Sequence, residues 1–220
     1  MFEVSKQYLV IGAGRFGSSV ATTLYELGHD VTVVDINPSR VQEISKSVAH
    51  ALQADATSEA ALSSLGVREF DVIVVAIGHD LQSSIMTCIL LIEMGARFVV
   101  ARAHTEMHGK VLSKIGVNRV VFPEKDMGQK LAHSLSAFNI VDLIELSSSS
   151  NVVEVTAPAE MVGRSLQELN LRARFGINVI ALRSKDGKTN ISPGGEDIIK
   201  EGDLIIAVGD NKALKKMGWV

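Results

Sequence analysis

The chain has 220 residues, 46% of them hydrophobic, and a formal net charge of −3, so it can form one large core or two modest ones. Its charges of both signs are spread along the sequence without a basic stripe, which argues against a nucleic-acid partner. The one cysteine, Cys88, excludes an intrachain disulfide or a cysteine-rich metal site and favours a reducing compartment. It lies in an apolar run, which predicts a core position.

No apolar run approaches the ~20 residues that span a bilayer, and residues 1–7 are short and polar, unlike a signal peptide. We therefore expect a soluble, cytoplasmic chain without direct membrane insertion. Any role at a membrane would come through a partner.

The first stretch that predicts a function is Tyr8–Asp35. Residues 8–11 are an apolar run typical of a buried strand, and residues 16–27 place apolar side chains at three- and four-residue steps, as in a helix. A second strand is expected at residues 31–34. The glycines between the first strand and the helix have G-x-G-x-x-G spacing.

These glycines are Gly12, Gly14 and Gly17, and each has a physical role in such a motif. The first permits the tight turn, the second lets a pyrophosphate approach the backbone, and the third lets helix and strand pack closely. The helix N-terminus supplies free N–H groups and a partial positive charge. Asp35, roughly 20 residues farther on, is placed to accept hydrogen bonds from ribose hydroxyls, and it disfavours NADP. The stretch predicts a nucleotide site; a Rossmann-like turn that binds nothing is the alternative.

Strands and helices then alternate as far as residue 122. We expect helices over about 37–47, 58–65, 81–94 and 105–115, and strands over 49–54, 71–76, 98–101 and 119–122. This alternation implies right-handed crossovers and a Rossmann-like, doubly wound parallel sheet of the α/β class. A further amphipathic helix, Lys125–Phe138, follows the completed sheet and needs a surface in a partner subunit or in the next domain.

The serine run at residues 147–150 is the predicted domain boundary, so that residues 1–146 form the first domain and 151–220 the second. In the second we expect strands over 152–156, 177–183 and 204–208, a brief extended piece at 191–192, and short helices over 165–169 and 212–217. This predicts a smaller α+β domain. A unit of about 70 residues has a marginal core, so we expect it to pair with another copy.

Several short motifs resemble those of RCK domains, the regulators of K+ conductance. In the first domain these are VIGAGRFG, DIN, ADAT, VAIG and FPEKDMG, and in the second they are LNLRARFG, NISP and EGDLIIAVG. The resemblance covers essentially the whole chain. It is closest to the KtrA/TrkA type, the cytosolic regulators of bacterial Ktr and Trk potassium uptake systems.

The resemblance implies a gating subunit, not an enzyme, that lies at the inner face of the cell membrane through a K+-translocating membrane partner. Such subunits form dimer-based rings, usually octamers. ATP or ADP binds the Rossmann site and sets the shape of the ring, while some Trk relatives bind NAD(H). The C-terminal domains dimerise and in many members bind cyclic di-AMP. A divalent cation such as Mg2+ lies between nucleotide-bearing subunits.

The resemblance also assigns roles to single residues. Arg15 matches an arginine that reaches the γ-phosphate in a neighbouring subunit, Asp55 flanks the adenine, and Glu124 matches an acid that helps to hold the cation. Further positions matched to the nucleotide site are Phe16, Ile36, Ala56, Thr57, Ala76, Ile77, Gly78, His79, Gln82 and Arg102.

Five of these assignments have a purely structural alternative. Arg15 is otherwise an exposed first-turn arginine, Asp55 a cap for the next turn, and Arg102 a solvated strand end. Glu124 is otherwise an acid at a helix N-terminus, where the helix dipole favours it. His79 is otherwise a polar loop residue.

In the second domain the resemblance implies a cyclic di-AMP site. The matched positions are Leu166, Arg172, Asn178 and Pro193. Arg172 would pair with a phosphate, and the apolar residues would cover the adenines. Gln167 departs from the pattern, because an aliphatic residue is usual there. The alternative for Arg172 is an ion pair with Glu168, four residues earlier.

An NAD-dependent oxidoreductase is the alternative function. It would need a proton-transfer group near the nicotinamide, and residues 151–220 contain no histidine. His104 and His108 have the i, i+4 spacing of metal ligands, but without an evident third ligand we expect them on a solvated helix face. A purely structural module would not require both the glycine loop and Asp35. Nucleotide-gated regulation is therefore the expected function.

Overall fold

The computed structural model of the chain describes residues 5–78, 80–136 and 140–219. His79 and Phe138, which the sequence assigned to the site and to a helix, lie outside the described residues. The chain divides after Glu124 into two compact units, which we describe separately.

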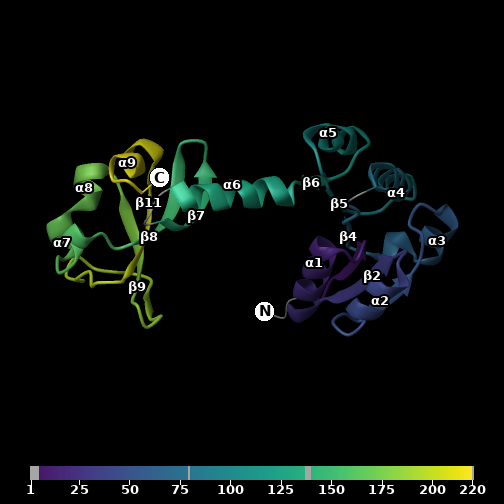
Figure 1. Cartoon of the computed structure of the whole chain (residues 1–220), viewed down its shortest axis with the longest axis horizontal. Helices are drawn as coiled ribbons and strands as arrows, with labels where there is room; N and C mark the ends of the chain where they lie inside the picture. The colour runs from purple at the N-terminus through teal and green to yellow at the C-terminus, as the bar shows by residue number, and fades with distance from the viewer. Residues whose placement is uncertain (1–4, 79, 137–139, 220) are drawn as a thin grey trace. The chain divides into compact units, whose positions relative to one another are not determined.

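The first unit alternates strands with helices (Figure 1). The elements are β1 (Gln7–Ile11), α1 (Arg15–Glu26), β2 (Asp30–Asp35), α2 (Pro38–Ile44), β3 (His50–Gln53), α3 (Glu59–Ser64), the 3-10 turn η1 (Val67–Glu69), β4 (Val72–Val75), α4 (Leu81–Glu93), β5 (Val99–Arg102), α5 (Glu106–Lys114) and β6 (Arg119–Val121). The described strands pair in parallel in the order β3-β2-β1-β4-β5-β6. This is the doubly wound order with its reversal between β1 and β4, so the predicted α/β fold is confirmed.

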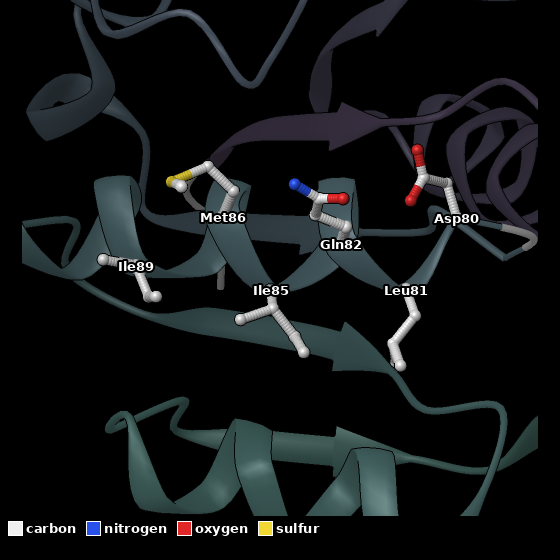
Figure 2. Close-up of a pocket in the computed structure, with 6 residues that line it drawn as sticks. All are labelled: Asp80, Leu81, Gln82, Ile85, Met86 and Ile89. Carbon is white, nitrogen blue, oxygen red and sulfur yellow. The ribbon is translucent and has the colours of Figure 1, made fainter.

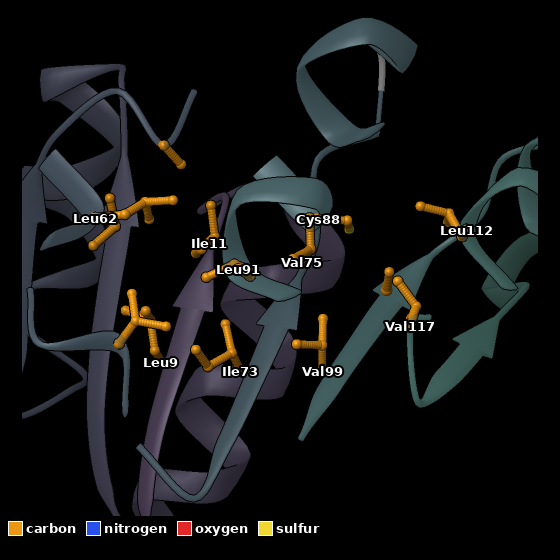
Figure 3. Close-up of a cluster of buried hydrophobic side chains, with 14 of the residues drawn as sticks. Leu9, Ile11, Leu62, Ile73, Val75, Cys88, Leu91, Val99, Leu112 and Val117 are labelled. Atoms are coloured by element: carbon orange, nitrogen blue, oxygen red, sulfur yellow. The ribbon is translucent and has the colours of Figure 1, made fainter. Parts of the chain in front are cut away.

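Both faces of this sheet are covered, as the continuous apolar strands predicted. One face packs Leu9, Ile11, Ile73 and Val75 against Leu91 and Cys88 of α4 (Figure 3). The other face packs against α1 and α2. Cys88 is fully buried, and burial raises the pKa of its thiol to about 12, so the predicted core position is confirmed.

Polar N-caps explain where several helices begin. The Asn37 side chain accepts hydrogen bonds from the backbone N–H groups of Ser39 and Arg40, with Pro38 at the first helical position. Ser58, Asp80 and Thr105 cap α3, α4 and α5 in the same way. Helices α1 to α5 end one to three residues earlier than predicted; α2, for example, ends at Ile44 and not at residue 47.

The second unit contains a mainly antiparallel sheet with short helices. Its elements are β7 (Ile140–Ser147), β8 (Ser150–Thr156), the 3-10 turn η2 (Ala159–Met161), α7 (Leu166–Leu169), α8 (Leu171–Phe175), β9 (Asn178–Arg183), β10 (Thr189–Asn190), β11 (Leu204–Asp210) and α9 (Asn211–Lys216). The strands pair in the order β10-β9-β11-β8-β7. The predicted smaller α+β domain is confirmed. Helix α6 (Pro123–Ser136) begins at the end of the first unit and continues into the second.

Three features of the second unit differ from the sequence prediction. The serine run at 147–150, expected to separate the domains, is the turn of the β7–β8 hairpin, where the Ser147 hydroxyl accepts a hydrogen bond from the N–H of Ser149 (3.2 Å). Strand β7 itself was not predicted, and it extends the second sheet. Helix α8 was also missed, because Asn170 in a left-handed conformation (φ +46°) ends α7 and begins a new helix at once.

In the part of the chain that the structure describes, no helix is both long and apolar enough to cross a membrane.

Candidate nucleotide-binding site

Two of the loop glycines are required by the fold itself. Gly12 has φ +101°, and a Cβ there would lie 3.2 Å from the carbonyl carbon of Ala76. A Cβ on Gly17 would overlap the carbonyl oxygen of Gly12 and lie 3.1 Å from its carbonyl carbon. These contacts press α1 against the turn after β1, and the Gly12 N–H donates to the carbonyl of Val34 (2.7 Å).

Gly14 differs from both. It has φ −74°, which any residue can adopt, and no atom of the described residues lies within 4 Å of the position of a Cβ. Neither the backbone nor the packing of this chain explains the glycine, whereas close approach of a phosphate would. Helix α1 begins here without a side-chain cap or an acid in the first turn of its described residues, which leaves N–H groups for an anion.

Asp35 lies at the end of β2 and is 6% exposed. Its Oδ2 accepts a hydrogen bond from the N–H of Ala13 (2.7 Å), and its Oδ1 accepts one from the N–H of Asn37 (2.8 Å). The guanidinium of Arg40 lies 3.7 Å from Oδ2. The carboxylate thus joins the glycine loop to β2, and each oxygen retains a second lone pair that suits a hydroxyl such as that of a ribose.

Three predicted residues lie around α1 and β2. Arg15 is the first residue of α1 and is exposed, which fits both its assigned role and the structural alternative. Phe16 is half-buried against the core on the α1 face of the sheet. Ile36 is 64% exposed, so it offers apolar surface directly after Asp35.

The segment after β3 shows mainly structural roles. The Oδ1 of Asp55 accepts hydrogen bonds from the hydroxyl (2.7 Å) and the N–H (2.9 Å) of Thr57, and these bonds lower the pKa of Asp55. Asp55 therefore closes this turn, as its structural alternative supposed. Ala56 is buried, and its carbonyl accepts a hydrogen bond from the hydroxyl of Thr87 (3.2 Å). This contact of Thr87 was not predicted from the sequence. The available signal was a polar residue within the apolar run of α4.

The loop after β4 lies across the strand-order reversal from β2. Ala76 is buried, Ile77 packs on the core, and Gln82 is exposed on the first turn of α4. At Gly78 a Cβ would lie 2.9 Å from Cζ of Arg102, so the guanidinium lies directly on the backbone of this loop.

Arg102 also forms an ion pair with Glu124, the second residue of α6. The Arg102 side chain is 14% exposed and that of Glu124 is 58% exposed, so Arg102 is not the solvated strand end that its structural alternative supposed. Partial burial of Glu124 opposes ionisation, but the hydrogen bond from Arg102, a backbone hydrogen bond and the charges of Arg102 and His104 together outweigh it and hold the pKa of Glu124 below its ordinary value. Glu124 is therefore a carboxylate near neutral pH.

His108 contradicts the expectation of a solvated helix face. It is 3% exposed, and its Nδ1 accepts a hydrogen bond from the N–H of His104 (3.3 Å), while its Nε2 has no partner among the described residues. Burial, together with the charge of His104, lowers the pKa of His108. Across residues 5–78, 80–136 and 140–219, no group of three His, Cys, Asp or Glu side chains could hold a metal ion.

The burial of His108 predicts a pH dependence of stability. Its pKa in the folded chain lies below the ordinary 6.5, so the unfolded chain binds more protons as the pH falls below that value. Stability contributed by the neutral imidazole is then present above pH 6.5 and is lost as the pH falls. We expect the free energy of unfolding to decrease less between about pH 7.5 and about pH 5.5 in His108→Gln than in the parent. Urea unfolding measures this, with the exposed His50→Gln as control; equal slopes for the parent and His108→Gln would contradict it.

A hollow of about 610 Å³ lies along α4 (Figure 2). It is lined by Asp80, Leu81, Gln82, Ile85, Met86 and Ile89. All six come from α4 and its N-cap, and the Asp80 carboxylate accepts hydrogen bonds from the N–H and hydroxyl of Ser83. The hollow is an apolar helix surface and does not include the glycine loop.

In the second unit, the backbone places two of the predicted contacts together. The N–H groups of Leu166 and Gln167 donate to the carbonyls of Asp197 and Gly195, which ties α7 to the loop that contains Pro193. Leu166 is partly buried against the core, so only part of it is available to a ligand.

Arg172 on α8 and Asn178 at the start of β9 are exposed. The alternative that Arg172 pairs with Glu168 is wrong. The Glu168 carboxylate instead accepts a hydrogen bond from the N–H of Ser165 (3.0 Å) in a capping box, and Asn170 interrupts the helix between the two residues.

Comparison with known proteins agrees with this architecture. Residues 8–123 match the family model of the TrkA-N domain, and residues 152–218 match that of the TrkA-C domain. Ktr system potassium uptake protein A of Bacillus subtilis (strain 168) is 41% identical over 212 residues, which cover 96% of this chain and 95% of that protein. Ktr system potassium uptake protein C of the same organism is 38% identical over 206 residues, which cover 94% and 93%.

Among solved structures, the GsuK RCK domain matches with a TM-score of 0.70 over 99% of this chain, at 17% identity. The match covers 48% of that longer chain, so this chain spans about half its length. At this identity the likeness supports the fold alone.

Proposed function

We propose that this chain, which belongs to the family of TrkA-domain proteins that includes the Ktr potassium uptake proteins, is a nucleotide-binding regulatory subunit of a potassium uptake system. In this proposal ATP or ADP binds at the glycine loop, and the ligand sets the conformation that a K+-translocating membrane partner senses. The chain performs no catalysis of its own.

One observation carries the nucleotide proposal. Gly14 leaves open space at the uncapped N-terminus of α1, while the Asp35 carboxylate is fixed at the end of β2 by the N–H groups of Ala13 and Asn37. The first suits a phosphate, and the second suits a ribose diol. Together they provide for the phosphates and the ribose of a nucleotide, and the adenine base is part of the proposal that rests on the family.

The direct test is to identify the nucleotide that copurifies with the protein by mass spectrometry, and to titrate the stripped protein with ADP and ATP by calorimetry. Micromolar binding of either nucleotide supports the proposal. Absence of binding by both would contradict it, and steady turnover of a nicotinamide cofactor with a cell-derived substrate would favour the oxidoreductase alternative.

Arg15 provides a way to distinguish the two nucleotides. Its exposed guanidinium at the mouth of the loop is proposed to reach the γ-phosphate bound by a neighbouring copy, which only ATP offers. A ligand shifts a conformational equilibrium only by its differential affinity for the two states. We expect Arg15→Ala to weaken ATP binding by about tenfold and ADP binding much less. Calorimetry with both nucleotides measures this; equal losses would show that Arg15 has only a structural role.

Assembly into a dimer-based ring, with an octamer as the expected size, is part of the proposal. Helix α6 exposes Met127 (64%), Leu131 (56%) and Leu135 (75%) at four-residue spacing, an apolar stripe that a second copy could cover. Light scattering of the full chain tests this, and a stable monomer at micromolar concentration would contradict it.

A cation at Glu124 fits the chain only in part. The carboxylate is ionised and exposed, but within the described residues it belongs to no group of three His, Cys, Asp or Glu side chains that could hold a metal ion. We propose that Mg2+ or another cation binds Glu124 only together with phosphate oxygens or a second copy, which complete the oxygen ligands that such ions prefer.

Cyclic di-AMP is proposed as a second ligand, in the second unit. Arg172 has no ion pair among the described residues and is exposed, so it is available to a phosphate. A dimer of this unit would offer a symmetric groove to a two-fold symmetric ligand. Leu166, Asn178 and Pro193 are the proposed further contacts, and the polar Gln167 stands where an aliphatic residue would cover the base.

We expect Arg172→Ala to weaken cyclic di-AMP binding to the full chain by about tenfold, because a phosphate loses its charged donor. Arg174→Ala is the matched control: it lies on the same helix, but its guanidinium lies over the ring of Phe175, 5.1 Å from the centroid. Titration with cyclic di-AMP compares the two variants. No binding by the parent at tens of micromolar, or equal losses in both variants, would end this proposal.

A further inference from the structure

Whether the site takes a mononucleotide or a dinucleotide depends on the space over the ends of β4 and β5. These strands lie on the far side of the reversal in strand order between β1 and β4. The glycine loop and Asp35 lie at the ends of β1 and β2, whereas β4 and β5 lie on the other side of the reversal. In doubly wound folds a dinucleotide crosses this point, so its second nucleoside lies over the ends of β4 and β5. A mononucleotide needs only the first side.

Arg102, the last residue of β5, occupies part of this space. Its guanidinium lies directly on the backbone of Gly78 in the loop after β4, where a Cβ would be 2.9 Å from Cζ. The backbone at residue 78 is not left-handed, so the conformation does not require glycine, and a side chain added there would instead meet the guanidinium of Arg102. Its other edge is held by the hydrogen bond from Nη2 to Glu124, and the side chain is 14% exposed.

The guanidinium also has an unsatisfied donor. Its Nε is buried and has no hydrogen-bond acceptor among the described residues. A phosphate oxygen suits a guanidinium in charge and in geometry, whereas an uncharged nicotinamide nucleoside offers it no anionic group. Arg102 therefore combines bulk that obstructs a second nucleoside with charge that favours a phosphate tail.

We propose that Arg102, packed on Gly78, makes this site selective for adenine mononucleotides over dinucleotides. The inference rests on the proposed function and adds the residue that sets the ligand class. A mononucleotide ends in phosphates near the glycine loop and leaves Arg102 in place. A dinucleotide must move the guanidinium off Gly78 and break its ion pair with Glu124.

The test compares ADP with NADH by calorimetry on the stripped full chain. NADH is the suitable dinucleotide because its dihydronicotinamide ring is uncharged. The positive charge of Arg102 cannot repel this ring, so weak binding of NADH would report the bulk of the side chain. We expect the parent to bind ADP at least about tenfold more tightly than NADH. In Arg102→Ala this ratio should fall by about tenfold, through tighter NADH binding.

Two further variants sharpen the result. Arg102→Met retains the bulk without the charge, so it should keep most of the discrimination against NADH. Arg97→Ala is the matched control, because Arg97 precedes the same strand at its opposite end, where it pairs with Asp71 (3.2 Å). It should leave the ratio unchanged, and thermal melts of all variants establish that they are folded.

The outcomes separate this inference from the proposed function. If the parent binds neither ADP nor ATP, the proposed function fails. If the parent binds ADP and NADH equally, or if Arg102→Ala leaves the ratio unchanged, only the inference fails. If Arg102→Met behaves like Arg102→Ala, bulk is not the cause and the steric account is overturned.

Discussion

Gly14→Ala is expected to leave the free energy of unfolding unchanged while reducing the affinity for ADP and ATP by about 100-fold, equivalent to about 2.7 kcal/mol. The physical reason is the open space at this position: a Cβ meets no described atom within 4 Å, and φ −74° suits alanine. The added methyl group would occupy volume that the phosphates need. Urea unfolding and calorimetry of the same preparation measure both quantities.

Gly17→Ala is the informative companion to this variant. Its Cβ would overlap the carbonyl oxygen of Gly12 and lie 3.0 Å from the Cβ of Ala76, so α1 must move away from the turn. Overpacking of this kind costs about 1–3 kcal/mol or more in stability. If Gly14→Ala loses nucleotide binding but keeps its stability, while Gly17→Ala loses stability, then residue 14 faces the ligand and residue 17 faces the protein. Normal affinity in Gly14→Ala would show that the phosphates do not approach residue 14.

Asp35→Asn is expected to damage both folding and binding. The carboxylate accepts hydrogen bonds from the N–H groups of Ala13 and Asn37 on different oxygens, and an amide places a donor against one of them. We expect a loss of about 1–3 kcal/mol in the free energy of unfolding. Nucleotide affinity should fall by about 100-fold, because the ribose acceptor is lost and the loop is no longer fixed.

Asp71→Asn separates these two effects. Asp71 also accepts a hydrogen bond from a backbone N–H, that of Gln7 (3.0 Å), and it lies before β4, at the opposite end of the sheet from the glycine loop. A smaller loss of stability with normal ADP affinity is expected, because the Asp71 side chain is 38% exposed and water can replace the lost acceptor. If folded Asp35→Asn also bound ADP normally, Asp35 would have no role in holding the ribose.

Local signals explain why most of the first unit could be predicted. The apolar runs around Leu9 and Ile73, together with polar N-caps such as Asn37 and Asp80, specify strands and helix starts within a few residues. Strand β7 was missed because its pairing with β8 is a tertiary contact, and the serines of the connecting turn resemble a linker. Helix α8 was missed because a single left-handed residue, Asn170, separates it from α7.

The candidate site likewise has a part that local sequence motifs predict and a part that depends on contacts between distant residues. The glycine spacing and Asp35 can be read from the sequence because the motif is local and its strand and helix context is regular. The contact of Arg102 with Gly78 and its ion pair with Glu124 join residues far apart in the sequence, so no local pattern indicates them. The burial of His108 likewise depends on how α5 packs, which the i, i+4 spacing with His104 does not specify.

Trp219 has a consequence for the order in which the chain folds during synthesis. It is fully buried in the core of the second unit, together with Leu214, whereas the cores of the first unit are built from residues up to Phe122. The first unit can therefore fold while the ribosome is still translating, because domains generally fold as units from the N-terminus. The second unit lacks its largest buried side chain until residue 219 has left the exit tunnel. During that interval a nucleotide could already stabilise the first unit, whereas pairing of second units between copies must wait until residue 219 has emerged.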